Sequence, residues 1–161
     1  MSDQFKVNIG SGDKKMPGVI NLDLRVLPKT DLGGTVASLP FANNSIESII
    51  CSDVLEHVPR HQLMAVLFEI HRVLKPNGYV KIKMPNLRAL ATAYVEGKID
   101  CKEFSRKIYG NQESGNPANF HKSGLDPETL SASLKIIGFS NVQVVVLDGN
   151  EFGNMGCRAH K

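Results

Sequence analysis

The sequence predicts an α/β fold with a Rossmann-like, doubly wound sheet that is mostly parallel, with a shortened first helix and an antiparallel C-terminal strand. Apolar segments of strand length alternate along the chain with amphipathic segments of helix length, and parallel strands require such crossover connections. The last two apolar segments are joined only by a short Gly/Asn-rich turn, which indicates an antiparallel hairpin at one side of the sheet. Helices are expected on both faces of the sheet.

The predicted strands are apolar runs, most of them bounded by Gly, Pro or Asn. A further short strand is expected near Thr35. The runs cover residues 5–9, 19–24, 48–52, 79–84 and 142–147, with a weaker one at 156–160.

Helices are expected over residues 60–74, 86–96 and 127–137. In the first, apolar residues recur at helical spacing, and a Lys-Pro-Asn-Gly stretch follows as a stop signal. The third begins after Asp126 with a proline and ends at Gly138.

The length of 161 residues predicts one domain, spanning residues 1–161. Residues 97–125 form a long polar connection with a short apolar, helix-like piece around residues 104–109. Connections of this length are uncommon unless they serve function, so we expect a segment that covers a substrate site. An ordinary surface connection is the alternative, and it is nearly as well supported.

The composition narrows the function classes. The formal charge is only +3 with scattered basic residues, and aromatic residues make up 6% without any Trp, so no nucleic acid is expected as partner. The three cysteines lack metal-ligand spacing, which predicts neither a metal site nor a disulfide framework. Without an apolar leader or an apolar run of about 18 residues, we expect no membrane association and a cytoplasmic location.

Two features at the carboxyl ends of predicted strands indicate a ligand site. Gly10-Ser11-Gly12 follows the first strand, where glycines let a ligand lie against bare backbone. Asp23 ends the second strand, where a carboxylate can accept two hydrogen bonds from a ribose diol. A tight turn would explain the glycines alone, and a salt bridge to Arg25 or a helix cap would explain Asp23 alone. Together they indicate an adenosine-containing ligand.

The spacing of these features distinguishes a site for a dinucleotide from a site for S-adenosylmethionine. Asp23 lies only 13 positions after Gly10, whereas dinucleotide sites place the acid roughly 20 residues on, beyond a full helix. A Pro-Gly pair at 17–18 interrupts the connection, and Lys14 stands where a third glycine would lie. A ligand without phosphates needs no helix dipole, so the sulfonium cofactor is favoured over NAD.

A series of motifs in order along the chain resembles the class I methyltransferase family, particularly its small bacterial members described only as predicted methyltransferases. The motifs lie at residues 7–24, 39–47, 53–58 and 72–78, and the resemblance extends from about 6 to 146. It implies a seven-stranded sheet with an antiparallel last strand, S-adenosylmethionine as cofactor and S-adenosylhomocysteine as product. The implied reaction is in-line methyl transfer to a small polar acceptor with an oxygen or nitrogen nucleophile.

The resemblance also implies which residues bind the cofactor. The glycine loop would pass under the methionyl and ribose parts, Asp23 would hold the ribose hydroxyls, and Leu24 and Leu39 would flank the adenine, although core packing explains Leu39 equally well. The family pattern often has an acid at the position of Asn8 and an Asp at that of Thr35. The full set is Asn8, Gly10, Ser11, Gly12, Asp23, Leu24, Thr35, Leu39, Ser52 and Asp53.

Candidate catalytic residues follow the fourth strand and lie in the covering segment. His57 could act as a general base because an imidazole titrates near neutral pH. His121 and Tyr109 are further candidates, and for all three a purely structural role is an alternative.

Two other functions stay open at this stage. One is a module that binds S-adenosylmethionine without catalysis, and the other, less favoured, is an NAD-dependent oxidoreductase. The expected partner is a small-molecule substrate, and the sequence leaves a homodimer open.

Overall fold

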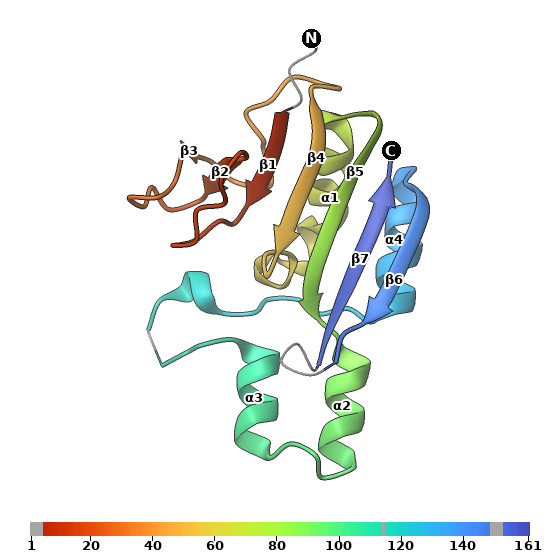
Figure 1. Ribbon diagram of the computed structural model, residues 1–161. Helices are drawn as coiled ribbons and strands as arrows, with labels where there is room; N and C mark the ends of the chain where they lie inside the picture. Colours follow the sequence, from red (N-terminus) through yellow and green to blue (C-terminus); the bar gives the residue numbers. More distant parts are fainter. Residues whose placement is uncertain (1–4, 114, 149–152) are drawn as a thin grey trace.

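The computed structural model describes residues 5–113, 115–148 and 153–161 and contains a seven-stranded sheet in the order β3-β2-β1-β4-β5-β7-β6 (Figure 1). Strands β1 to β5 are parallel, and β7 runs antiparallel to both β5 and β6. The strands are β1 Phe5–Ile9, β2 Ile20–Asp23, β3 Leu32–Gly33, β4 Ile46–Ser52, β5 Leu74–Pro85, β6 Ser140–Val146 and β7 Asn154–His160.

This topology confirms the predicted fold class, a mostly parallel sheet with an antiparallel strand at the C-terminal end, and the strand order reverses at β1. The pairing of β6 with β7 confirms the predicted hairpin, while residues 149–152 of its turn lie outside the described part of the chain. The short strand expected near Thr35 is β3, which ends two residues earlier.

The predicted helices are present with shifted ends. The first expected helix starts later, because Arg60–Gln62 form a separate 3-10 turn (η2). No helix in the described ranges is long and apolar enough to cross a membrane. The helices are α1 Leu63–Val73, α2 Leu87–Val95, α3 Cys101–Tyr109 and α4 Pro127–Ile137, with further 3-10 turns η1 Leu55–His57 and η3 Pro117–Asn119.

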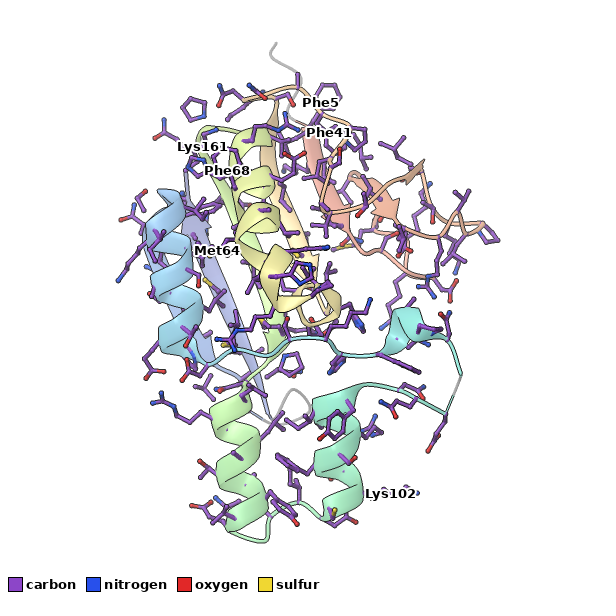
Figure 2. The ribbon with its side chains drawn as sticks, turned by 180° about the vertical axis from the view of Figure 1, so that it is seen from behind. Phe5, Phe41, Met64, Phe68, Lys102 and Lys161 are labelled. Carbon is purple, nitrogen blue, oxygen red and sulfur yellow. The ribbon has the colours of Figure 1, made fainter. Side chains whose placement is uncertain are left out.

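Helices α1 and α4 lie side by side on one face of the sheet (Figures 1 and 2). Their apolar sides, represented by Leu67, Ile70 and Leu134, are fully buried against alternate residues of the central strands. The outer side of α1 carries Met64 and Phe68, which are 38% and 57% exposed (Figure 2). The main core is therefore the layer between these two helices and the sheet.

The opposite face of the sheet has no helix over it in the described ranges, so the expectation of helices on both faces is wrong there (Figure 1). Right-handed crossovers from β1 to β2 and from β2 to β3 would place helices on that face, but residues 10–19 and 24–31 are short loops. The uncovered face is accordingly polar: the Arg158 guanidinium carbon lies 4.1 Å from the centre of the Tyr79 ring, and Lys81 is exposed beside them.

Helices α2 and α3 form a small unit at the end of the sheet where β5 finishes (Figure 1). Leu90 of α2 is buried there with Ile99, and the rings of Tyr94 and Phe104 stack with centroids 4.7 Å apart. Asn86 begins α2 by accepting hydrogen bonds from the backbone N–H groups of Arg88 and Ala89. This unit carries the segment expected to cover the site.

A charged pair on α1 fixes the connection between β3 and β4. The Glu69 carboxylate accepts two hydrogen bonds of 2.7 Å from the Arg72 guanidinium and one of 2.7 Å from the backbone N–H of Leu39. Arg72 also donates to the carbonyls of Leu39 and Phe41 at 3.2 and 3.0 Å. Residues 39–41 are thereby held against α1, although no helix precedes them.

Substituting Arg72→Lys is expected to lower the free energy of unfolding by about 1–2 kcal/mol, because an ammonium cannot reproduce this fork of partly buried hydrogen bonds. Urea denaturation measures the change. Arg88→Lys is the matched control: Arg88 pairs with Asp126 and Glu128 but is 61% exposed, so its replacement should cost less than about 0.5 kcal/mol. Equal losses in the two variants would contradict the role assigned to Arg72.

Candidate functional site

The loop after β1 is shaped by Gly10. Its φ of +69° and the position of Val54, whose Cγ2 would lie 2.3 Å from an added Cβ, leave room only for glycine. The backbone N–H groups of Gly10 and Ser11 both donate to the Leu22 carbonyl, at 2.8 and 3.1 Å. The loop therefore crosses tightly over the end of β2 without forming a helix.

A cleft of about 310 Å³, called here the first cleft, opens at the carboxyl ends of β1, β2 and β4. Its volume falls in the range of small-molecule sites, and its position is the one that open parallel sheets use for ligands. Half of the predicted cofactor residues line it: Gly10, Asp23, Leu24, Thr35 and Asp53.

The other predicted cofactor residues do not line the first cleft. The buried Asn8 side chain donates to Asn21 at 3.2 Å, and Leu39 packs in the core, which was the alternative explanation for it. Ser11 is buried, and Ser52 lies on the uncovered face of the sheet beside Lys83. Gly12 contributes through its backbone N–H, which donates to the Asp23 carboxylate at 2.7 Å.

The Asp23 carboxylate is held in place by its neighbours. It is buried, which disfavours its charge, but it accepts hydrogen bonds from the backbone N–H groups of Arg25 and Gly12 and a longer one, 3.3 Å, from the Arg25 side chain. These bonds outweigh burial and lower the pKa of Asp23. The salt bridge that the sequence offered as an alternative is thus present, and the carboxylate is an ionised acceptor at the rim of the cleft.

Several residues that line the first cleft carry no signal that the sequence analysis used. Val36 and Ala37 lie in an irregular connection, and Gln62 lies in the 3-10 turn before α1. Asn119 and Lys122 come from the long segment 97–125. Only that segment's expected covering role pointed toward them, because its residues show no periodicity.

A second cleft of about 420 Å³ lies beside the first, between the end of β4 and the segment 97–125. Three residues, Asp53, His57 and Asn119, line both clefts. The second cleft is otherwise polar, and its lining includes Glu56, Arg106, Lys107, Asn111 and His121.

His57 and His121 meet in the second cleft, although 64 positions separate them in the sequence. Their ring centroids are 4.9 Å apart and the rings are nearly perpendicular. Nδ1 of His57 lies 3.1 Å from the Phe120 carbonyl, and Nδ1 of His121 lies 3.0 Å from the Lys107 carbonyl. Since a carbonyl only accepts, each Nδ1 carries the hydrogen, and each Nε2 keeps its lone pair.

Burial lowers the pKa of both imidazoles. For His57 the positive charge of Lys122 adds to the effect of burial, and for His121 the neighbouring His57 does so. The hydrogen bonds to the carbonyls act in the opposite direction but are weaker. Both rings are therefore neutral at pH 7.

Backbone hydrogen bonds hold the covering segment over this pair. The Glu56 carbonyl accepts from the N–H groups of Lys122 and Ser123 at 2.7 and 3.1 Å, and the N–H of His121 donates to the Tyr109 carbonyl at 3.0 Å. Gly110 permits the close approach, because an added Cβ would lie 2.2 Å from the Asn119 carbonyl oxygen. These contacts place His121 opposite His57.

Tyr109 does not lie where the sequence analysis placed it. Its side chain is 56% exposed and does not line either cleft. It terminates α3 with its side chain turned outward, and it supports the site only through the carbonyl that accepts from His121. His57 and His121 are the two catalytic candidates that the structure brings together.

Glu56, the residue before His57, is not among the site residues predicted from the sequence. Its side chain is 2% exposed, and Oε2 has no hydrogen-bond partner among the described residues. Burial, with a smaller contribution from the negative charge of Asp53, raises the pKa of Glu56 to about 8. Donor atoms of Glu56, His57 and His121 all lie within 4.8 Å of one another, although the sequence predicted no metal site.

The raised pKa of Glu56 predicts an unusual pH dependence of stability. The folded protein keeps a proton that the unfolded chain releases above pH 4.5, so the free energy of unfolding should fall between pH 4.5 and about 8. Glu56→Gln removes this pH-dependent loss. In metal-free buffer, the free energy of unfolding of the variant should exceed that of the wild type by on the order of a few kcal/mol near pH 8, but by little at pH 5.

Urea denaturation across this pH range measures the effect, and its slope against pH is the readout. The exposed Glu128, replaced by Gln, is the control and should keep the wild-type slope. A Glu56→Gln variant that also keeps that slope would show that Glu56 is already ionised at neutral pH.

Part of the chain is similar to a known protein family. Residues 17–82, from the loop before β2 into β5, match the family model of a methyltransferase domain. No curated protein sequence matches the chain.

Solved structures match over almost the whole chain. A SAM-dependent methyltransferase from Archaeoglobus fulgidus shares 17% identity over 99% of this chain and 87% of its own, with a TM-score of 0.65. One from Thermotoga maritima shares 16% identity over 100% and 84%, with a TM-score of 0.68. One from Methanosarcina mazei shares 17% identity over 100% and 93%, with a TM-score of 0.66.

The structural similarity shows that the fold is that of SAM-dependent methyltransferases, and the domain match covers the strand that ends in Asp23 and the turn that carries His57. The shared fold and the partial domain match both make this chain similar to S-adenosylmethionine-dependent methyltransferases.

Proposed function

We propose that the protein transfers a methyl group from S-adenosylmethionine in the first cleft to a small polar acceptor in the second. The observation that carries this proposal is the shared lining of the two clefts by Asp53, His57 and Asn119. A donor and an acceptor bound in adjoining clefts meet at these residues, as in-line transfer requires.

In the proposed reaction, a lone pair on an acceptor oxygen or nitrogen attacks the methyl carbon as the bond from that carbon to sulfur breaks. The bonding electrons stay on sulfur, which becomes the neutral thioether of S-adenosylhomocysteine, and the acceptor gives up one proton. His57 is suited to take the proton, because its Nε2 is unprotonated at pH 7 and its ring lines both clefts.

The cofactor would lie along the ends of β1 and β2. Gly10 offers bare backbone, and the ionised Asp23 can accept hydrogen bonds from the ribose hydroxyls when the Arg25 side chain, which is 44% exposed, yields its long bond. Leu24 and Thr35 line the same cleft on the adenine side of this arrangement.

Residues 97–125 are proposed to cover the acceptor, within one domain that spans the chain. Arg106 and Lys107 of α3 line the second cleft and favour an acceptor with anionic or strongly polar groups. The predicted cytoplasmic location, the absence of a nucleic acid partner and an open homodimer stay predictions.

Cofactor binding is tested by Asp23→Asn, which should weaken S-adenosylhomocysteine binding about 10-fold or more, since hydrogen bonds to a charged group are lost or weakened. Isothermal titration measures the affinity, and Glu128→Gln, remote from the cleft, is the matched control with unchanged affinity expected. Unchanged affinity in the Asp23 variant would refute the proposed cofactor position.

Catalysis is tested by His57→Gln with S-adenosylmethionine and a panel of hydroxyl and amine acceptors. We expect kcat to fall about 100-fold or more, while the affinity for S-adenosylhomocysteine changes little. His61→Gln, in the exposed turn η2, should behave as wild type. If the wild type binds the cofactor but methylates no acceptor in the panel, the non-catalytic binding module becomes the better description.

A further inference from the structure

We infer that Glu56, His57 and His121 form a binding site for a divalent first-row transition-metal ion, which holds a hydroxyl group of the acceptor. This inference rests on the proposed function, since it assigns the site to the acceptor side of the same reaction. It narrows the acceptor from an oxygen or nitrogen nucleophile to a hydroxyl compound.

The donor atoms of these three residues suit a metal ion. Two imidazole nitrogens and one carboxylate oxygen lie within 4.8 Å of one another on η1 and on the covering segment. A bound ion lies about 2.1 Å from each donor, so its ligands are at most about 4 Å apart. Side-chain rotations that shorten the distances between the donor atoms by roughly 1 Å would therefore complete a three-ligand site.

The two imidazoles are oriented as in histidines that bind metals. Histidines that bind metals usually donate the N–H of the other ring nitrogen to a carbonyl or carboxylate, which fixes the tautomer and the ring plane. His57 and His121 both do so, through Nδ1 to the carbonyls of Phe120 and Lys107. Each Nε2 thus presents a lone pair, and two neutral rings can approach one cation.

The Glu56 carboxylate is buried without a partner for one of its oxygens. It lies at the bottom of the second cleft with 2% exposure, and Oε2 finds no hydrogen-bond partner among the described residues. A buried polar atom without a partner is costly, and such atoms in native structures call for an explanation such as an ion. A cation beside the two imidazoles supplies the missing partner.

The donor set indicates which ion is bound. Imidazole suits Zn²⁺, Fe²⁺ and related ions, whereas Mg²⁺ and Ca²⁺ prefer oxygen ligands alone. Three protein ligands leave at least one coordination position open, as in catalytic metal sites. All three ligands line the second cleft, and His57 also lines the first, so the site adjoins the proposed cofactor cleft.

The ion would make a hydroxyl group reactive. Coordination lowers the pKa of the acceptor hydroxyl, which releases its proton to water and leaves a metal-bound alkoxide. The alkoxide oxygen attacks the methyl carbon, the bond from carbon to sulfur breaks with its electrons left on sulfur, and the methyl ether then leaves the ion. With the ion bound, His57 serves as a ligand and not as the proton acceptor.

The experiment uses metal-free protein and the ions alone. Isothermal titration with Zn²⁺ and the visible absorption of added Co²⁺ report on binding and on nitrogen ligation, and Mg²⁺ is a second probe. We expect one Zn²⁺ per chain, bound at least 100-fold more weakly by His121→Gln and by Glu56→Gln. His61→Gln is the matched control and should bind as wild type, and circular dichroism verifies the fold of each variant.

The inference is overturned if Zn²⁺ does not bind, or binds equally well to the wild type and to both ligand variants. Its failure is distinct from failure of the proposed function. If methyl transfer proceeds at full rate in the presence of a chelator, the metal site is refuted and the proposed methyltransferase function still stands. If the wild-type protein does not bind S-adenosylhomocysteine, in contrast, the proposed function is refuted whether or not a metal ion binds.

Discussion

The packing of α1 and α4 against one face of the sheet is the interaction on which the other parts of the molecule depend. Side chains such as Leu67, Ile70 and Leu134 are fully buried there, and each contributes roughly 1.5–3 kcal/mol by leaving water. This single layer aligns the ends of β1, β2 and β4, from which the loops of the first cleft begin. Because the opposite face lacks a helical layer in the described ranges, those loops are positioned from one side only.

Much of the fold could be predicted from the sequence because it follows from local patterns. Apolar runs and a periodic helix defined the strands and α1, and the short interval from Gly10 to Asp23 indicated correctly that no long helix lies between them. The sequence did not predict that one face of the sheet has no helix over it in the described ranges. Alternation of strands and helices does not say on which face each connection lies. That face depends on the direction of each connection across the sheet, which only the strand order reveals.

The site was predicted less completely, for a related reason. Residues that line the first cleft next to a strand, such as Asp23 and Asp53, could be found because strand ends are visible in the sequence. The meeting of His57 and His121 depends on hydrogen bonds between distant backbone groups, and Tyr109 turned outward although it is close in sequence to the site. No role was predicted for Glu56 because its character comes from burial, which a single acidic residue in a sequence does not disclose.

The hydrogen bonds that orient His57 and His121 come from the covering segment itself, through the carbonyls of Phe120 and Lys107. A movement of this segment that admits an acceptor would break the bond between His57 and Phe120, whereas His121 and Lys107 both belong to the segment and would move together. While the segment is lifted, the His57 ring would have no fixed tautomer or direction. Under the proposed function, His57 would be oriented only once the acceptor is enclosed, so a cofactor bound to the open molecule would not meet an oriented partner.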